Sequence, residues 1–399
     1  MTNEVKNVPE IRFPEFSGEW EEKMLGDVLT ILDGDRGNNY PSQSDFLEFG
    51  HTLFLNASNV TKNGFSFTQK QYITEKKSIS LGNGKLVKDD VVLTTRGSIG
   101  NIAWYDEEIY REIPYARINS GMLILRSNNK DMASFVSQFL KSIKGKRQID
   151  RISFGSAQPQ LTKKDIKLYR ITFPQIKEQR KIGAFFSKLD RQIELEEQKL
   201  EKLEEQKKGY MQQIFSQKLR FKDVNGNDYP EWENKKFLEI FKLVPSKKNQ
   251  IKSSEVVENG IIPVVDQGKN IFLGYSNEKS KAIEDFDNVI VYGDHTTIVK
   301  YIKEPFIIGG DGVKLLTSNE DSLIHYLYIL LQHFNVNPEG YKRHYSILKT
   351  KKMNISNTKE EQEKIGNFFE KQDNLIEKQS DKVELLKNRK KGFLHKMFV

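Results

Sequence analysis

The fold of this chain is decided by the stretch IKEQRKIGAFFSKLDRQIELEEQKLEKLEEQKKGYMQQIF at residues 176–215, because this stretch occurs twice. Its second copy is KEEQEKIGNFFEKQDNLIEKQSDKVELLKNRKKGFLHKMF at residues 359–398, and the two copies align without a gap at an offset of 183 residues. Identical residues occupy 18 of the 40 aligned positions, and both copies keep the order EQxKIGxFF. Self-similarity over this length predicts that the chain contains two copies of one structural unit.

Both copies carry an apolar residue alternately every four and every three positions, with charged residues between them. This spacing is typical of a helix that packs along a partner helix. The stripe residues are Ile182, Phe186, Leu189, Ile193, Leu200, Leu203, Tyr210 and Ile214 in the first copy, and Ile365, Phe369, Ile376, Val383, Leu386, Phe393 and Met397 in the second. Each helix would be about 60 Å long at about 1.5 Å per residue. The simplest partner of each helix is the other copy, and an approximate two-fold axis requires the two to run antiparallel.

Polar residues interrupt both stripes at matching positions, namely Glu196 with Gln379 and Lys207 with Lys390. The simpler interpretation is that these are solvated breaks without a function. The other interpretation is that they set the register of the two helices against slipped pairings.

A second repeated motif lies near the start of each copy. IRFPEFSGEWEEKMLGDV at residues 11–28 resembles LRFKDVNGNDYPEWENKKFLEIF at residues 219–241, and both contain an Arg-Phe pair followed by a Trp-Glu pair. Between motif and helix, runs of alternating Val, Ile, Leu and Thr predict short strands, and one helical stretch follows them. The sequence thus predicts an α+β chain with a pseudo-two-fold repeat. Two mixed α/β modules would be separated by an antiparallel pair of long helices, a coiled coil. We place the modules at residues 1–157 and 219–345 and the helical regions at 158–218 and 346–399.

In each module, one strand ends in a polar turn that contains glycine, and such turns expose side chains and backbone amides. The two segments are DVVLTTRGSIGNIAW at residues 90–104 and NVIVYGDHTTIVKYI at residues 288–302. The candidates for ligand contact are Arg96, Ser98 and Asn101 in the first turn, and Asp294, His295 and Thr296 in the second. For any one of them, an ordinary hairpin loop is the alternative interpretation.

Basic residues concentrate where each module meets its helix. Residues 141–170 contain nine Lys or Arg against two Asp, and residues 342–352 contain five Lys or Arg, one His and no acid. The net charge of +8 also favours a polyanionic partner such as nucleic acid. A solvated face is the usual explanation of one charge run, but recurrence at both junctions favours phosphate contacts on DNA. The candidate residues at the junctions are Lys146, Arg147, Arg151, Gln158, Lys342 and Arg343.

The sequence excludes several other classes of protein. There is no cysteine, which rules out disulfides and cysteine-ligated zinc and fits a reducing compartment. No apolar run resembles a signal peptide or a membrane span, so we expect a cytoplasmic protein. The sequence lacks a phosphate-binding GxxxxGK[ST] loop, an HExxH zinc motif and the [ND]PP[YF] motif of amino-methyltransferases. We therefore expect no catalytic residue, no metal site and no cofactor in this chain.

The two frame motifs, RFPEFSGEWEEKMLGDV with RFKDVNGNDYPEWENKKFLEI and the doubled EQxKIGxFFxxxD helices, closely resemble the specificity subunit of type I restriction-modification systems. The resemblance covers essentially the whole chain. It implies that each module is a target recognition domain and that the helices are conserved spacers. It also implies partners: double-stranded DNA, two modification (methyltransferase) subunits that carry S-adenosylmethionine, and two restriction subunits that use ATP and Mg. By resemblance, subunit docking lies on the helices around Ile182, Phe185, Phe186, Ile365, Phe368 and Phe369.

Two modules on a helical spacer can read two half-sites about one or two turns of DNA apart. We expect a bipartite target that is asymmetric, because the modules differ, with a gap set by helix length. Three alternatives stay open: a specificity protein for another methyltransferase-nuclease system, a coiled-coil scaffold that binds only protein, and an unrecognised nuclease.

Overall fold

The computed structural model describes residues 7–153, 160–340 and 342–399. The chain forms two compact units, unit 1 with Met1–Glu197 and Lys382–Val399, and unit 2 with Gln198–Asp381. Each unit therefore contains the beginning of one long helix and the end of the other.

Unit 1 is built on two small sheets and one two-stranded ribbon. The four-stranded antiparallel sheet has the order β2 (Thr30–Asp33), β10 (Met122–Arg126), β7 (Val91–Thr94) and β8 (Ile102–Trp104). The three-stranded sheet has the order β6 (Tyr72–Ile73), β3 (Thr52–Leu55) and β9 (Ala116–Ile118), in which β3 and β9 are parallel. The ribbon pairs β1 (Glu21–Met24) with β11 (Arg170–Phe173), and a short hairpin pairs β4 (Val60–Thr61) with β5 (Gly64–Phe65). The helices between these strands are α1 (Leu25–Val28), α2 (Glu75–Ser80), α3 (Glu107–Glu112), α4 (Lys130–Lys141), α5 (Ile143–Ser153) and α6 (Lys163–Lys167), with 3-10 turns η1 (Gln43–Asp45) and η2 (Ala57–Asn59).

Unit 2 repeats this plan. Its antiparallel sheet has the order β13 (Phe241–Val244), β20 (Val313–Ser318), β17 (Ile290–Gly293) and β18 (Val299–Lys300). Its second sheet has the order β14 (Gln250–Ile251), β19 (Ile307–Gly309), β15 (Ile262–Val265) and β16 (Gly274–Ser276), and β12 (Glu233–Lys236) pairs with β21 (Lys352–Ile355). The helices are α8 (Phe237–Ile240), α9 (Ile324–Phe334) and α10 (Tyr345–Leu348), with 3-10 turns η3 (Lys247–Asn249), η4 (Ser253–Glu255), η5 (Lys279–Lys281) and η6 (Phe286–Asn288).

The module interiors share a topology that their sequences do not reveal. In the antiparallel sheet of unit 1, β10 pairs with β2 and β7, and in that of unit 2 the equivalent strand β20 pairs with β13 and β17. The parallel pair of β3 and β9 in unit 1 matches the parallel pair of β15 and β19 in unit 2. The central strands β7 and β17 are fully buried. Such strands require only apolar residues of suitable size, so their identities can diverge while the pairing is kept.

The two long helices are α7 (Ile176–Phe215) and α11 (Lys359–Lys396), and both pass through both units. In unit 1 the ring of Phe185 lies edge-on to that of Phe393, with centroids 5.1 Å apart, and in unit 2 Tyr210 lies edge-on to Phe368 at 5.1 Å. These pairs are related by the repeat, and they confirm the antiparallel pairing. The predicted stripes face inward, since Ile182, Phe186, Ile365 and Phe369 are at most 2% exposed.

Polar residues within the stripes are paired rather than solvated. Lys207 binds Asp373 (Nζ to Oδ1, 2.5 Å) in unit 2, and Lys390 binds Asp190 in unit 1. The two ion pairs are related by the offset of 183 residues. Among the other seam residues, Glu196 binds Lys382 at 2.5 Å. The solvated-break interpretation is therefore wrong, and the pairs favour one register of the helices.

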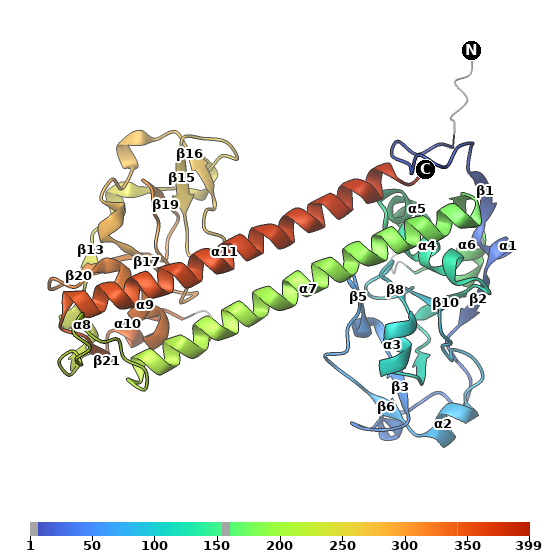
Figure 1. Ribbon diagram of the computed structural model, residues 1–399, viewed down its shortest axis with the longest axis horizontal. Helices are drawn as coiled ribbons and strands as arrows, with labels where there is room; N and C mark the ends of the chain where they lie inside the picture. Colours follow the sequence, from blue (N-terminus) through green and yellow to red (C-terminus); the bar gives the residue numbers. More distant parts are fainter. Residues whose placement is uncertain (1–6, 154–159, 341) are drawn as a thin grey trace, which may run out of the picture. The chain divides into compact units, whose positions relative to one another are not determined.

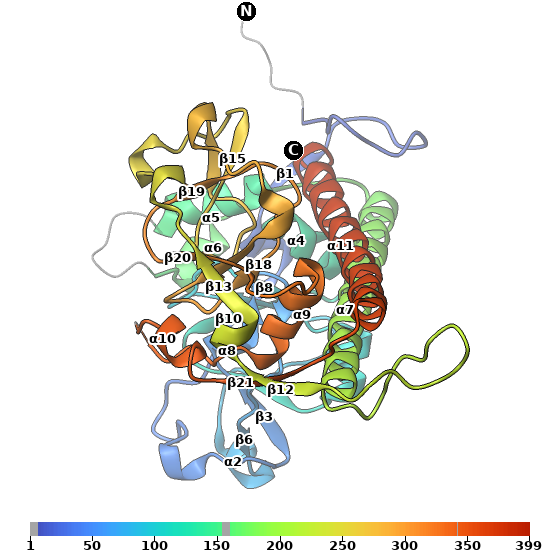
Figure 2. The same cartoon turned by 90° about the vertical axis from the view of Figure 1, so that its left-hand side faces the viewer.

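Each hydrophobic core is closed by the last phenylalanine of a long helical segment. In unit 1, Phe398 stacks on Phe186 with centroids 5.7 Å apart and lies edge-on to Trp20. In unit 2, Phe215 stacks on Phe369 at 6.5 Å. The short helix α9 lies between the antiparallel sheet of unit 2 and α11 (Figures 1 and 2), as α4 packs on α7 in unit 1.

Candidate nucleic-acid interface

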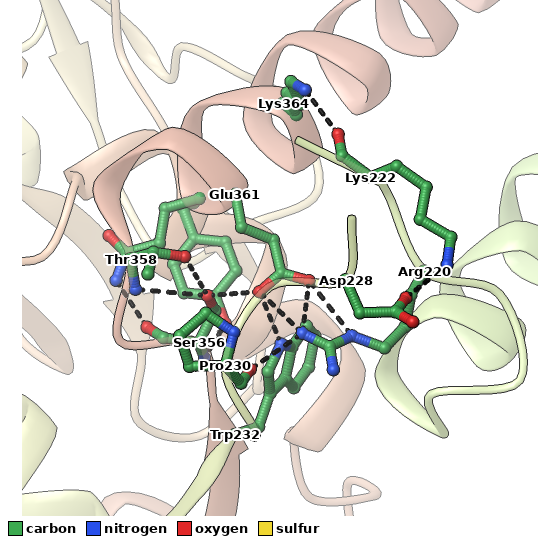
Figure 3. A network of polar contacts seen from close by, with 11 residues as sticks. Arg220, Lys222, Asp228, Pro230, Trp232, Ser356, Thr358, Glu361 and Lys364 are labelled. Atoms are coloured by element: carbon green, nitrogen blue, oxygen red, sulfur yellow. Dashed lines mark hydrogen bonds and ion pairs between the residues drawn. The ribbon is translucent and has the colours of Figure 1, made fainter. Parts of the chain in front are cut away.

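A buried carboxylate fastens the start of α11 to the repeated Arg-Phe and Trp-Glu motif of unit 2 (Figure 3). Glu361 is 1% exposed and accepts hydrogen bonds from Arg220 (Nη2, 3.0 Å), Trp232 (Nε1, 2.8 Å) and Ser356 (Oγ, 2.6 Å). Lys364 adds a hydrogen bond to the carbonyl oxygen of Lys222. The arginine and tryptophan side chains of the motif thus bind a residue of their own unit.

Unit 1 repeats the arginine contact of this fastening. Glu178 is 1% exposed and accepts two hydrogen bonds from Arg12, from Nε at 2.8 Å and from Nη2 at 2.7 Å. Lys181, the repeat equivalent of Lys364, binds Glu15 and lies over the ring of Phe13. The repeated motifs therefore build a structural joint in each unit.

Burial corrects the expectation that four apolar residues of these helices meet a partner directly. Ile182, Phe186, Ile365 and Phe369 are enclosed in the cores of their own units. Phe185 and Phe368 are half-buried, and they pack on Phe13 and on Phe221 respectively. Docking by these two rings stays a prediction.

The structure brings two sequence-predicted segments of unit 2 together. The turn after β17 lies against residues 342–345: Nδ1 of His295 is 3.0 Å from the carbonyl oxygen of Lys342, and the carbonyl oxygen of Asp294 accepts from the backbone N–H of His344 at 2.8 Å. Lys342 and Arg343 are exposed. A basic segment thus lies beside the turn, as phosphate and base contacts by one surface would require.

Asp294 itself has a structural role. It is 4% exposed, and its Oδ1 accepts from the backbone N–H of Tyr345 at 2.9 Å. This burial corrects the expectation that its carboxylate faces a ligand. His295 and Thr296 are half-buried, and the Thr296 hydroxyl donates to the carbonyl oxygen of Gln267 at 2.6 Å.

Sequence reasoning missed the loop that connects β15 with β16. Its Gln267 accepts a hydrogen bond from the backbone N–H of His295 at 3.1 Å, which joins this loop to the predicted turn. Lys300, at the end of β18, donates to the loop carbonyls of Asp266 at 2.9 Å and Asn270 at 2.5 Å. Burial lowers the pKa of Lys300, and the nearby carboxylate of Asp266 opposes that shift. A lysine in an apolar strand gave no local signal of this role.

Unit 1 also brings its turn and its basic segment together. A side-chain carbon on Gly100 would lie 3.1 Å from Ile149, so the turn after β7 packs against α5. Lys146, Arg147 and Arg151 are exposed on α5, as are Arg96 and Ser98 on the turn. These five positions stay predictions for DNA contact, and Gln158 lies outside the described residues.

Asn101 links this turn to the rest of unit 1. Its side-chain amide donates to the carbonyl oxygen of Val60 at 2.8 Å. Asn59, which directly precedes Val60, is 2% exposed and donates to the carbonyl oxygens of Gln69 at 2.7 Å and Ser66 at 3.1 Å. Both amides position the loop that follows β3, and base contact by Asn101 stays a prediction.

The part of the chain that the structure describes contains no cluster of three or more His, Cys, Asp or Glu side chains suited to a metal ion. Within the same residues, no helix combines the length and the apolarity that crossing a membrane requires.

The fold defines a class of protein in which two α+β units share a pair of long helices, and solved structures share this fold. One is the crystal structure of the type I restriction-modification system S subunit from M. genitalium, with a TM-score of 0.64, 15% identity, and coverage of 98% of this chain and 99% of that chain. Another, titled as the structural basis of complex assembly and conformational transition of the type I R-M system, has a TM-score of 0.52, 16% identity, and coverage of 95% and 97%.

The family model of the type I restriction modification DNA specificity domain matches residues 17–205 and 229–385. The chain belongs to this family of type I restriction-modification specificity proteins. It is similar to two specificity subunits from Methanocaldococcus jannaschii. The MjaVIII subunit is 25% identical over 232 residues, which are 56% of this chain and 51% of the relative, and the putative MjaX subunit is 24% identical over 308 residues, which are 71% and 69%. The chain thus spans about half the length of the first relative.

Proposed function

We propose that this chain gives a type I restriction-modification complex its DNA sequence specificity, and that units 1 and 2 each read one part of a bipartite target. The observation that carries the proposal is the recurrence of one arrangement. In each unit a turn between equivalent strands, β7–β8 or β17–β18, packs against an exposed basic segment. Family membership supports the same conclusion.

Within each unit, we assign phosphate contacts to the lysines and base reading to Arg, Asn and Gln side chains. Arg96 in unit 1 and Arg343 in unit 2 are exposed residues of the type that reads guanine. The two sets of loop residues differ, so the two halves of the target differ and the site is asymmetric.

The long helices have two roles in this proposal. First, α7 has Phe186 in the core of unit 1 and Phe215 in the core of unit 2, so the helix pair sets the gap between the two parts of the target. Second, the modification subunits dock on the exposed side of the helices beside the EQxKIGxFF motifs. Lys188 and Lys371 occupy equivalent exposed positions there.

The remaining partners follow from the family. We propose assembly with two modification subunits that use S-adenosylmethionine and two restriction subunits that use ATP and Mg, in the cytoplasm. The chemistry belongs to those subunits, and this chain contributes recognition without catalytic residues.

Exchange of one module tests the proposal. Residues 20–157 are replaced by the first module of another family member, and the methylated target is mapped in cells that carry the modification partner. The proposal requires a change in one half of the target only. A change in both halves contradicts independent reading.

Insertion of four residues in the 195–205 stretch of α7 tests the role of the helices. The insertion adds about 6 Å of helix at about 1.5 Å per residue, and α11 receives a matching insertion to keep the pairing. We expect a longer gap between unchanged halves. An unchanged gap length rejects the proposal that helix length sets it.

A further inference from the structure

One buried lysine organises a whole loop of unit 2. The Lys300 side chain is 6% exposed, and its ammonium group donates to the carbonyl oxygens of Asp266 (2.9 Å), Asn270 (2.5 Å) and Ile271 (3.4 Å). A carboxylate oxygen of Asp266 lies 3.5 Å away. The three donors of one ammonium group therefore bind three carbonyls of the loop at residues 266–271, which is an uncommon use of a buried lysine.

This loop has little other support on one side. A cavity of about 440 Å³ lies beside it, lined by Asp266, Gln267 and Asp311 among others. An apolar core cannot hold the loop at a cavity, so the contacts to Lys300 carry more of its order. A buried charge is costly unless its hydrogen bonds are satisfied, and here the loop carbonyls satisfy them.

The same loop contacts the turn that we assign to DNA. Gln267 receives the backbone N–H of His295 and the hydroxyl of Thr296, and its own amide approaches the carbonyl oxygen of Asp311 at 3.4 Å. Three loops of unit 2 thus meet at Gln267. At the tip, Lys269 and Asn270 are exposed, and both are residue types that contact DNA.

Unit 1 has a different device at the matching place. The loop after β3, which corresponds to the loop after β15, is held by the buried amide of Asn59 through the carbonyls of Ser66 and Gln69. An amide and an ammonium group thus perform one task in two diverged modules. Independent solutions at equivalent places indicate that the shape of this loop matters to both units.

We propose that Lys300 is a positioning residue for the second half of the target, because it holds loop 266–271 in the shape that presents Lys269 and Asn270 beside the turn at residues 294–297. The inference rests on the proposed function for its readout in DNA. The buried ammonium group touches no DNA. It acts through the loop, whose ordering before binding reduces the entropy lost on recognition.

The test uses the full chain assembled with its modification partner, and compares Lys300→Met with Lys303→Met. Lys303 is exposed on the same unit and pairs with Glu370 at 2.8 Å, so its loss controls for charge. Methylation rates are measured on duplexes with single base-pair changes in either half. We expect Lys300→Met to reduce discrimination in the second half by about tenfold per changed position, with the first half and the Lys303→Met variant unchanged.

A second measurement is independent of DNA. Hydrogen exchange of the amides in loop 266–271 should accelerate by about tenfold or more in Lys300→Met, because the loop loses the shared donor that holds its carbonyls. Lys300→Arg keeps a cation and should restore part of the protection. The mirror variant Asn59→Ala should reduce discrimination in the first half only.

The inference is overturned if the Lys300→Met variant discriminates bases in the second half as well as the wild type does. An equal loss of discrimination in both halves would overturn it too. If Lys300→Met yields no folded complex, Asn270→Ala decides, because its exposed amide can be removed without disturbing a core. Unchanged second-half discrimination in Asn270→Ala also overturns the inference. If the wild-type complex has no bipartite target, the proposed function is rejected instead. The hydrogen-exchange measurement then still tests whether Lys300 orders the loop.

Discussion

Glu361 offers a sharp test of how the long helix α11 is fastened to unit 2. Its carboxylate is 1% exposed and accepts hydrogen bonds from Arg220, Trp232 and Ser356. Glu361→Gln keeps the size of the side chain but removes its charge. It also turns one acceptor oxygen into an N–H₂ group that faces donors (Figure 3).

The size of the effect follows from these contacts. Removal of one charge from a buried pair costs about 3–5 kcal/mol. We expect about 2–4 kcal/mol here, because Arg220 keeps 16% side-chain exposure and a hydrogen bond to the carbonyl oxygen of Pro230. The double variant with Arg220→Met should lose less than the sum of the single variants, since it leaves no unpaired buried charge.

The assay is hydrogen exchange as a function of urea concentration, resolved by peptides of each unit. The free energy of opening in unit 2 should fall, while unit 1 is unchanged. Glu363→Gln, an exposed change on the same helix, is the matched control and should stay within about 0.5 kcal/mol of the wild type. If Glu361→Gln cannot be distinguished from this control, the joint does not stabilise unit 2 and the reasoning fails.

Two further predictions use contrasts within the molecule. A side-chain carbon on Gly183 would lie 2.3 Å from Oγ of Ser134, whereas on Gly366 it would meet its nearest atom at 3.3 Å. Gly183→Ala should therefore lower the free energy of unfolding by about 1–3 kcal/mol and lower the melting temperature with it, while Gly366→Ala should be near neutral. Equal effects of the two changes would contradict this reasoning. Burial lowers the pKa of Lys141 to about 8 from its ordinary 10.5, against the opposing effect of Asp190. The lowered pKa means that the folded state loses its proton first, so the penalty is fully present below pH 8 and disappears as the pH rises towards 10.5. Lys141→Met should thus gain about 1–2 kcal/mol at pH 7, below the full value of such a shift because the residue keeps some solvent contact, and the gain should vanish near pH 10.5 in urea titrations; a gain that does not change with pH contradicts the assignment.

The sequence predicts those parts of the fold whose signal is local and periodic. Two apolar stripes, with Ile182 in the first and Phe369 in the second, predict the two long helices, since the spacing of four and three is visible within a few residues. The antiparallel pairing follows from the repeat together with an approximate two-fold axis, because related amphipathic helices alone can also pack in parallel. The shared topology of the modules is not visible, because a buried strand accepts many apolar sequences.

The candidate site divides in the same manner. Exposed basic residues such as Arg147 and Arg343 are evident from composition, and the structure places the segment that carries each of them beside the turn predicted independently. Asp294 resembles a ligand in the sequence, yet it holds the backbone of Tyr345. Lys300 does not resemble a functional residue in the sequence, because its partners lie about thirty residues away and only the fold brings them to it.

The most direct test of the central claim is methylome sequencing of cells that carry this gene with its modification partner. Two different recognition modules on one pair of helices predict one methylated motif with two specified parts of different sequence, separated by an unspecified gap of constant length. A continuous motif, a palindromic motif or a gap of variable length would contradict reading by two separate units.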